Sequence, residues 1–313
     1  MKYKKILLLR PENKIGDTVC WSFFPRELKK IYPKSKLSVV TAAPLELLKL
    51  NPHIDNLMSL PFDRTFKNFI KLLKILLYLN KQKYDLIIIP DLTKKGRFFV
   101  KLINAKQVIL AHKPLKEHIT HGLSSALEIL GAKTVDTTYE LFISSDDEKY
   151  AQKFMDKNNL LNNKFIIINP FACEKYRTLG IEKIKNIIKL LQDNLLDYKF
   201  IILDYKKQYI SLNKICIFYT SNNIMQTATI IKHSNYVLTV DTGIAHIADV
   251  FHKKMTVLFS LQPFHNQTEK NNNLIRWTPL TIGTRILHTD GTVDDISEYK
   301  IIKEVLEHIM EKE

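Results

Sequence analysis

Short runs of apolar residues recur along the whole chain, and segments whose apolar positions repeat every three or four residues separate them. Continuous apolar runs are typical of parallel strands buried on both faces, and the segments between them have the period of amphipathic helices. In the first half this pattern predicts strands at residues 5–9, 37–41, 86–90 and 107–110, and helices near 18–31, 45–50, 66–79, 97–103 and 119–130. In the second half it predicts strands at 165–169, 200–203, 216–218, 237–240 and 256–259, and helices at 181–191, 225–232 and 244–250.

The alternation of strand and helix predicts an α/β protein with two Rossmann-like parallel-sheet domains in series. A chain of 313 residues exceeds the usual size of one compact domain. The joint is expected around residues 144–163, where a polar helix ends in two asparagines, which gives domains 1–155 and 156–313. A last helix at 298–310, with Ser297 as its cap, is predicted as well, with the option that it packs back on the N-terminal domain.

Composition excludes several classes of protein. The longest apolar stretch, residues 69–79, carries two lysines and is far shorter than the roughly 20 residues that span a bilayer. The basic start resembles a signal segment, but its apolar run stops after four residues at Arg10, so secretion is not expected. The three cysteines lie far apart, which favours reduced thiols in the cytoplasm. Neither common glycine-rich nucleotide loop occurs.

The positive charge is concentrated in the first half. Residues 1–155 hold 27 Lys and Arg against 15 Asp and Glu, whereas residues 156–313 hold 20 against 17. Such an excess attracts phosphates or carboxylates, on nucleic acid, on an anionic membrane face or on a substrate. No nucleic-acid recognition motif accompanies it, so a nucleic-acid partner is not expected.

Two segments follow predicted strands and open predicted helices, which is where ligands bind in open α/β sheets. The first, residues 13–18, contains Gly16 and Asp17, and its alternative interpretation is that Asp17 only caps a helix. The second contains Asp241, Thr242, Gly243 and His246; its helix end suits a pyrophosphate, and the alternative is a capped helix with a polar core histidine.

A third segment, residues 169–179, follows the predicted strand at 165–169. It begins with Asn169 and carries Lys175 and Arg177, two cations that are able to hold a leaving phosphate. A solvated loop is the alternative for this segment.

Taken together, these segments resemble glycosyltransferase family 9, the lipopolysaccharide heptosyltransferases. The resemblance covers most of the chain in the family's order. It rests on the N-terminal strand, the turn 15–17, and the segments 25–33, 51–55, 169–171 and 240–243 with His246.

The resemblance implies a GT-B enzyme with two domains facing a central cleft. It implies an N-terminal acceptor-binding domain, a C-terminal nucleotide-sugar domain, and inverting, metal-independent transfer of heptose from ADP-heptose to Kdo or heptose of the inner core. No cofactor or metal is implied, and the chain has no D-x-D triplet. Asp17 corresponds to the general base. The donor would be held by Asn169, Asp241, Thr242, Gly243 and His246, with Asp204 at the ribose and Lys175 and Arg177 at the leaving phosphate.

An anionic lipopolysaccharide acceptor gives the basic first half a role, with Lys14, Arg64, Lys67 and Arg97 as the expected contacts. The enzyme would then work in the cytoplasm, at the cytoplasmic face of the inner membrane, with peripheral membrane contact. Alternatives are a family member with another sugar or acceptor and a twin-Rossmann nucleotide-sugar epimerase. The heptose position, the oligomeric state and the roles of His112, His118 and His121 stay open.

Overall fold

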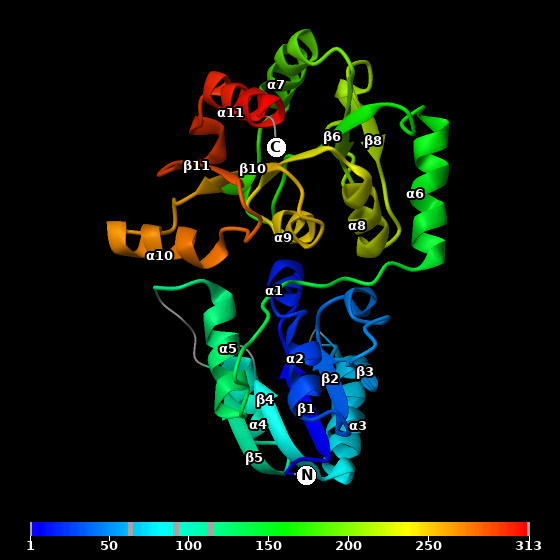
Figure 1. The fold of residues 1–313 in the computed structure, drawn as a ribbon, viewed down its shortest axis with the longest axis vertical. Coiled ribbons are helices and arrows are strands. Elements are labelled where there is room, and N and C mark those ends of the chain that lie inside the picture. Colours follow the sequence, from blue (N-terminus) through cyan, green and yellow to red (C-terminus); the bar gives the residue numbers. More distant parts are fainter. Residues whose placement is uncertain (1, 62–64, 90–93, 112–115, 312–313) are drawn as a thin grey trace. The chain divides into compact units, whose positions relative to one another are not determined.

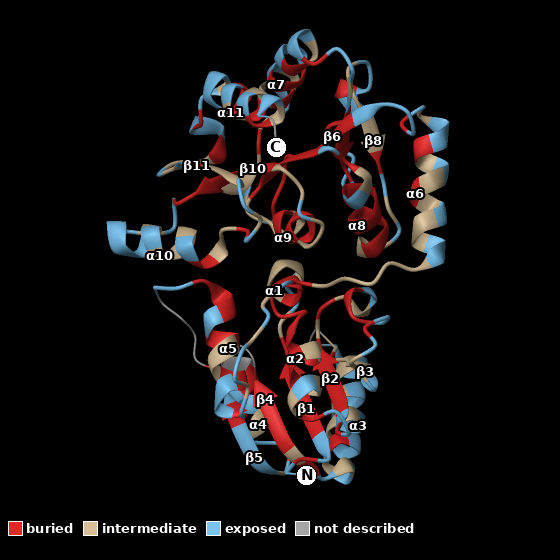
Figure 2. Cartoon of the chain, in the orientation of Figure 1, coloured by how far each residue is buried: buried red, intermediate tan, exposed pale blue. Residues whose placement is uncertain are grey.

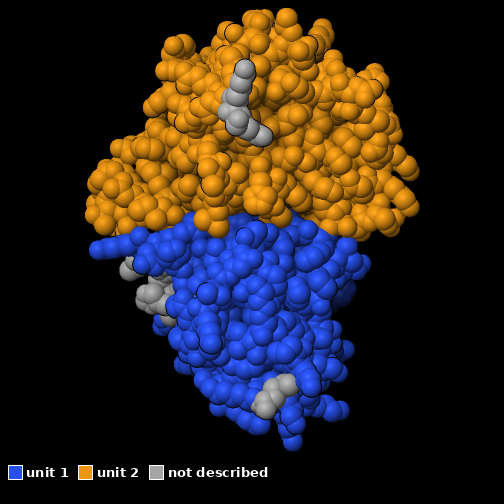
Figure 3. Space-filling view, in the orientation of Figure 1, with its two compact units in different colours: residues 1–142 blue, residues 143–313 orange. Residues whose placement is uncertain are grey.

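The computed structural model describes residues 2–61, 65–89, 94–111 and 116–311, without the side chains of Lys94 and Lys95 (Figure 1). The chain divides into two compact units, Met1–Phe142 and Ile143–Glu313 (Figure 3). The boundary thus precedes the polar helix that we expected at the joint, and the predicted limit at residue 155 moves to residue 142. Among the described residues, no helix combines the length and the apolar character needed to cross a membrane.

Unit 1 is a five-stranded parallel sheet with strand order β3-β2-β1-β4-β5. Its strands are β1 (Lys5–Arg10), β2 (Lys36–Thr41), β3 (Asn56–Ser59), β4 (Tyr84–Ile89) and β5 (Ala105–Leu110). Its helices are α1 (Ile15–Cys20), α2 (Phe24–Ile31), α3 (Phe66–Gln82), α4 (Lys94–Val100) and α5 (Ile119–Ile129), with a short 3₁₀ turn at Leu45–Leu47.

Helices cover both faces of this sheet because β1 and β4 are apolar on both faces (Figure 2). Leu7 and Leu9 of β1 lie in the cluster against which α3 and α4 pack. Successive side chains of a strand point to opposite faces, so Ile6 and Leu8 face the other layer. There α2 contacts α5, and the hydroxyl of Tyr32 donates a 2.9 Å hydrogen bond to the carbonyl of Leu130.

The predicted helix at residues 18–31 is two helices in the structure. α1 ends at Cys20 and α2 begins at Phe24, with Pro25 in the first turn of α2. Proline lacks the N–H of a helix interior and its ring clashes with the preceding turn, so it favours a new helix start over a continuous helix. The break leaves Asp17 on a short helix of its own, directly after β1.

Asp85 ties three strands together at the amino edge of unit 1. Its carboxylate accepts hydrogen bonds from the N–H groups of Lys4 and Lys5 and from Lys106, at 2.8, 3.0 and 2.7 Å. These bonds, with Lys106 as the largest contribution, lower the pKa of Asp85 from 3.8 to about 2. Ionised Asp85 therefore stabilises the fold at any pH above its unfolded-state pKa, and this stability is lost as the pH falls from about 4 towards 2.

We expect Asp85→Asn to lower the free energy of unfolding at neutral pH and to have a much smaller effect near pH 2. Urea unfolding at both pH values measures the difference. Asp146→Asn is the matched control, since the Asp146 side chain is 92% exposed and should matter little at either pH. An Asp85→Asn effect of equal size at both pH values would contradict the assigned role.

Unit 2 is a six-stranded parallel sheet with strand order β11-β10-β9-β6-β7-β8. Its strands are β6 (Lys164–Asn169), β7 (Tyr198–Leu203), β8 (Ile217–Tyr219), β9 (Tyr236–Val240), β10 (Met255–Ser260) and β11 (Arg285–Thr289). Its helices are α6 (Ser145–Lys157), α7 (Ile181–Asn194), α8 (Ile224–His233), α9 (Gly243–Val250), α10 (Gln267–Trp277) and α11 (Glu298–Met310), with 3₁₀ turns at Lys175–Arg177, Ile210–Leu212 and Val293–Asp295.

The last helix belongs to the core of unit 2. α11 packs against α7 and β10, and Ile301, Ile302 and Val305 lie in the same buried cluster as Ile184 and Ile188 of α7. The apolar side of α11 is therefore used by its own unit, and the option that this helix packs back on the N-terminal domain stays a prediction. Ser297 stands at the N-cap position, but its side chain makes no capping hydrogen bond.

Candidate functional site

The carboxyl ends of β6 and β9 carry most of the predicted donor residues of unit 2. The two strands pair in parallel, with Asn169 opposite Thr239. The buried amide of Asn169 donates hydrogen bonds of 3.0 Å to the hydroxyls of Thr239 and Thr242. Asn169 thus fixes the position of the N-cap residue of α9, and the structure brings two of the predicted segments, residues 169–179 and 241–246, to one strand edge.

Arg177 and Asp241 form an ion pair at this edge. One guanidinium nitrogen of Arg177, Nη1, lies 3.0 Å from Oδ2 of Asp241 and 3.2 Å from its carbonyl oxygen, and Nη2 pairs with Glu174. Burial raises the pKa of Asp241, although the charges of Arg177 and His246 oppose the rise. Burial also disfavours the charge on Arg177, but the carboxylates of Glu174 and Asp241 keep its pKa above the ordinary value.

The N-terminus of α9 is the second feature of this edge. Thr242 is its N-cap residue, and the Thr242 hydroxyl accepts a hydrogen bond of 3.3 Å from the N–H of Ile244. The first N–H groups of a helix have no partner within the helix, and the helix dipole favours negative charge there. A helix end beside a fixed guanidinium is therefore suited to an anion, and a diphosphate has the required charge.

His246 lies one turn into α9 and is 4% exposed. Its ring meets Trp277 edge to face, with ring centroids 6.1 Å apart. Trp277 ends α10, a helix that we did not predict from its polar sequence. The structure thus gives the imidazole ring of His246 an aromatic partner that the sequence did not indicate.

The carboxylate of Asp249, near the end of α9, anchors the chain that follows α10. It accepts hydrogen bonds from the N–H groups of Leu280 and Thr281, both at 2.7 Å, and from the Thr281 hydroxyl at 2.6 Å. Asp249 itself is 4% exposed, and its loss leaves the N–H groups of Leu280 and Thr281 without this charged acceptor.

We expect Asp249→Ala to lower the free energy of unfolding by about 3 kcal/mol. Chemical denaturation followed by circular dichroism measures it, with Asp290→Ala as the control because the Asp290 side chain is 70% exposed. Equal stabilities of the two variants would show that this anchor contributes nothing.

Lys175 differs from Arg177 although both lie on the same 3₁₀ turn, Lys175–Arg177. Its side chain is exposed, and among the described residues it has no hydrogen bond or ion pair. Arg177, by contrast, is held by two carboxylates. Arg177 is therefore a cation held in a fixed position, whereas the Lys175 side chain is free to change its conformation.

Asp204, the residue expected at a ribose, is buried directly after β7. Its two carboxylate oxygens accept hydrogen bonds from the N–H groups of Gln208 and Tyr209, at 2.9 and 2.8 Å. Asp204 thus shapes the turn after β7, and its ribose role stays a prediction. Beside it lies an aromatic pair that sequence reasoning missed: the rings of Phe171 and Tyr205 are 4.8 Å apart, and Tyr205 is 61% exposed.

Asp17 lies in the first turn of α1, in unit 1. Its Oδ2 is 3.5 Å from Nη2 of Arg10 and 4.0 Å from Nζ of Lys14. The Arg10 side chain is only 2% exposed and also donates to the hydroxyl of Thr18 at 2.8 Å. The N-cap residue of α1 is Lys14, so Asp17 is not the cap of this helix, and its carboxylate pairs with a buried guanidinium instead.

The remaining predicted residues of unit 1 occupy separate positions. Lys14 is exposed, as are Lys67 in the first turn of α3 and Arg97 in α4. Both helices follow the carboxyl ends of strands, which is the edge where α1 also begins. Arg64 lies outside the described residues.

The three histidines of the basic half have different surroundings. His118 caps α5 by accepting from the N–H of Thr120, and His121 pairs with Glu117. His112 lies outside the described residues. Across the described ranges no group of three or more His, Cys, Asp or Glu side chains is arranged to hold a metal ion. Metal independence stays a prediction.

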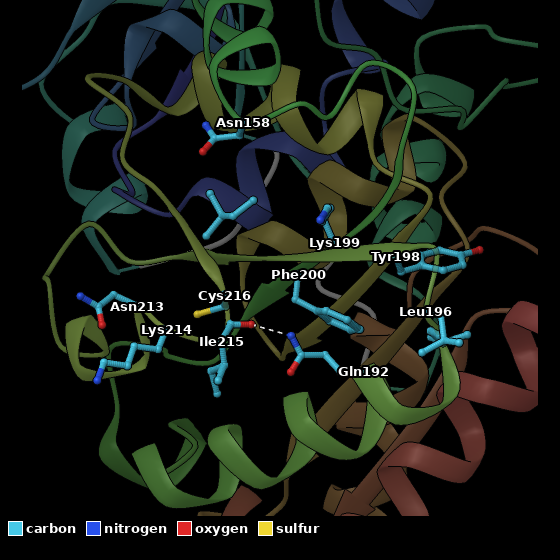
Figure 4. A pocket seen from close by; sticks show the side chains of 12 residues that line it. Asn158, Gln192, Leu196, Tyr198, Lys199, Phe200, Asn213, Lys214, Ile215 and Cys216 are labelled. Carbon is cyan, nitrogen blue, oxygen red and sulfur yellow. Dashed lines mark hydrogen bonds between the residues drawn. The ribbon is translucent and has the colours of Figure 1, made fainter.

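A pocket of about 440 Å³ lies elsewhere in unit 2 (Figure 4). Its lining includes the first residues of β7, the chain before β8, and Gln192, whose side-chain amide donates to the carbonyl of Ile215 at 2.8 Å. Burial raises the pKa of the Cys216 thiol in this lining to about 12. The pocket therefore sits at the amino ends of the strands, the opposite edge from Asn169 and Asp241, and is distinct from the candidate site.

Two parallel sheets in series, each with connecting helices, are the architecture of the GT-B class of glycosyltransferases. No protein-family model matches the chain. Over 300 residues it is 24% identical to a putative lipopolysaccharide heptosyltransferase 4 from Escherichia coli, covering 88% of this chain and 79% of the relative.

Two solved structures have the same fold. A glycosyltransferase family 9 protein from Veillonella parvula superposes with a TM-score of 0.83 at 18% identity, covering 100% of this chain and 99% of that one. The ADP-heptose lipopolysaccharide heptosyltransferase II from E. coli superposes with a TM-score of 0.71 at 15% identity, covering 97% and 98%. These matches confirm the predicted resemblance to glycosyltransferase family 9, the GT-B fold class, and the prediction that the chain is a glycosyltransferase.

Proposed function

We propose that this chain transfers heptose from ADP-heptose to a Kdo or heptose residue of the lipopolysaccharide inner core, with inversion and without a metal. The single observation that carries the proposal is the ion pair of Arg177 and Asp241 beside the N-terminus of α9. A fixed guanidinium and a helix end are both complementary to a nucleoside diphosphate. The names of the relatives supply the sugar and the nucleotide.

In this proposal unit 2 binds the donor. The diphosphate lies against the N–H groups at the start of α9 and against Arg177, and Lys175 swings onto the leaving phosphate. Asn169 keeps Thr242 in place, and His246 contacts the sugar or the diphosphate. The exposed ring of Tyr205 on Phe171 offers a flat surface for the nucleobase.

Unit 1 binds the acceptor and supplies the base. Lys14, Lys67 and Arg97 attract the phosphates and carboxylates of the lipopolysaccharide core, at the cytoplasmic face of the inner membrane. The acceptor hydroxyl oxygen attacks the anomeric carbon of heptose, its proton passes to the Asp17 carboxylate, and the bond from that carbon to ADP breaks. The electron pair leaves with ADP, whose charge Lys175, Arg177 and the α9 terminus offset.

Nucleotide binding in the presence of a chelator tests the donor half of the proposal. Isothermal titration calorimetry with ADP, UDP and ADP-heptose in EDTA should show binding of ADP and ADP-heptose, and weaker binding of UDP. No binding of ADP, or binding only after a divalent metal is added, would contradict the assignment. Conversion of ADP-heptose with no acceptor present would point to an epimerase instead.

A further inference from the structure

Five large apolar side chains form a ridge on the outer side of α3. Phe69, Ile70, Leu73 and Leu77 come three, four, seven and eleven residues after Phe66, which puts all five on one side of the helix, and each is 40% exposed or more. Phe66 and Leu77 are 78% and 72% exposed. The core needs only the other side of the helix, where Leu72, Ile75, Leu76 and Leu79 pack on the sheet. The ridge is therefore surplus to the packing of unit 1.

A row of lysines runs beside this ridge. At 100° per residue, Lys67, Lys74 and Lys81 lie together on one flank of α3, with Lys71 next to them. All four side chains are exposed, and residues 65–84 contain no aspartate or glutamate. The outer surface of α3 is thus an apolar strip with a purely cationic margin.

α4 extends the same surface. Phe98 and Leu102 are 58% and 39% exposed, and residues 94–111 also contain no acidic residue. The ends of the two helices are tied together, because Asn80 of α3 donates to the carbonyl of Leu102 and accepts from the N–H of Asn104, both at 2.8 Å. Both helices pack on one buried cluster, so they cover one face of the sheet.

We propose that the outer sides of α3 and α4, which we call the α3–α4 face, dock this enzyme on a bilayer that contains anionic phospholipid. A helix with a large apolar strip and flanking lysines lies in the plane of a membrane interface, with the apolar residues among the acyl chains and the ammonium groups at the headgroups. A second copy of the chain suits this face poorly, since a symmetric contact would bring cationic rows together.

The docking proposal does not depend on the donor assignment. It rests on exposed residues of α3 and α4, and its test needs neither ADP-heptose nor transfer. If the α3–α4 face has another occupant, the protein will bind its donor but will not bind vesicles. If the assignment of unit 2 is wrong, the protein will bind vesicles but will not bind the donor.

Vesicle flotation with the full chain tests the proposal. Wild-type protein should float with phosphatidylcholine vesicles that contain phosphatidylglycerol, and far less with phosphatidylcholine alone. The triple variant Lys71→Gln/Lys74→Gln/Lys81→Gln should lose about 100-fold in affinity for the anionic vesicles, at about fivefold per lysine. The variant Phe69→Ser/Leu73→Ser/Leu77→Ser should lose binding at any lipid composition.

Two matched controls change the same residue types elsewhere. Lys183→Gln/Lys185→Gln/Lys189→Gln removes three lysines from α7, and Leu196→Ser/Ile282→Ser removes apolar side chains that are 87% and 99% exposed. Both controls should float like the wild type. Circular dichroism and urea unfolding establish that each variant is folded.

Three results would overturn the docking proposal. Wild-type protein that does not float with anionic vesicles would exclude the proposed occupant, and so would α3 variants that float as well as the wild type. Light scattering that shows a dimer of the wild type and a monomer of the Phe69, Leu73 and Leu77 variant would assign the α3–α4 face to a second copy instead.

Discussion

Replacement of Asp17 by Asn should lower the rate of heptose transfer about 10²- to 10⁴-fold, the usual contribution of general acid–base catalysis. Asparagine keeps the shape of the side chain and its place beside Arg10, but it cannot take the proton of the acceptor hydroxyl. Because the donor residues lie in unit 2, the affinity for ADP-heptose should stay within about twofold of the wild type. Steady-state kinetics and calorimetry on the same preparation measure both quantities.

The pair of Asp17 with buried Arg10 requires a control for stability. Urea unfolding shows how much of any loss reflects misfolding, and Asp17→Glu, which keeps the carboxylate, should retain more activity than Asp17→Asn. Asp136→Asn is the matched control in unit 1, since its carboxylate is 52% exposed and pairs with Arg26 away from α1. Full turnover by folded Asp17→Asn would rule out Asp17 as the base.

Replacement of Arg177 by Gln should weaken the binding of ADP about 100-fold and slow transfer at least as much. The same change should destabilise the fold by about 3 kcal/mol, because it leaves the partly buried Asp241 carboxyl without its counter-ion. Without Arg177, only His246 still opposes the effect of burial, so the pKa of Asp241 rises further and its carboxyl becomes more readily protonated. Calorimetry with ADP and urea unfolding separate the two effects.

A second substitution distinguishes binding from folding. Arg177→Gln/Asp241→Asn removes both charges, so stability should partly return, whereas ADP affinity should not. Lys175→Gln is the control for charge alone: since Lys175 is exposed, stability should be unchanged and ADP affinity should fall by only about tenfold. Binding of ADP by Arg177→Gln as tightly as by the wild type would contradict the phosphate site.

The buried strands were predictable because each is a continuous apolar run. β1, β6, β9 and β10 lie where the pattern put them, within one or two residues at their ends. β3 and β11 were missed because both are edge strands, short or partly polar, whose sequences carry little apolar signal. α10 was missed for a related reason, since its side toward the core is small and its sequence is rich in asparagine.

Candidate site residues were predictable at turns between a strand and the following helix, because the carboxyl ends of parallel strands lie at one edge of the sheet. The side chains with which these residues pair were not predictable. Arg10 was interpreted only as the end of an apolar run, yet it is the buried cation that faces Asp17. The pairing of Arg177 with Asp241 joins residues far apart in sequence, and no local pattern distinguishes Arg177 from Lys175. Side-chain pairs across strands require the three-dimensional register.

Mass spectrometry of a defined acceptor tests the central claim most directly. A truncated lipopolysaccharide acceptor that ends in Kdo or heptose is incubated with the enzyme, ADP-heptose and EDTA. We expect the acceptor to gain the mass of one heptose, with release of one ADP for each sugar transferred. An acceptor that stays unchanged while ADP-heptose is consumed, or one that gains a sugar only from a different nucleotide donor, would contradict the account.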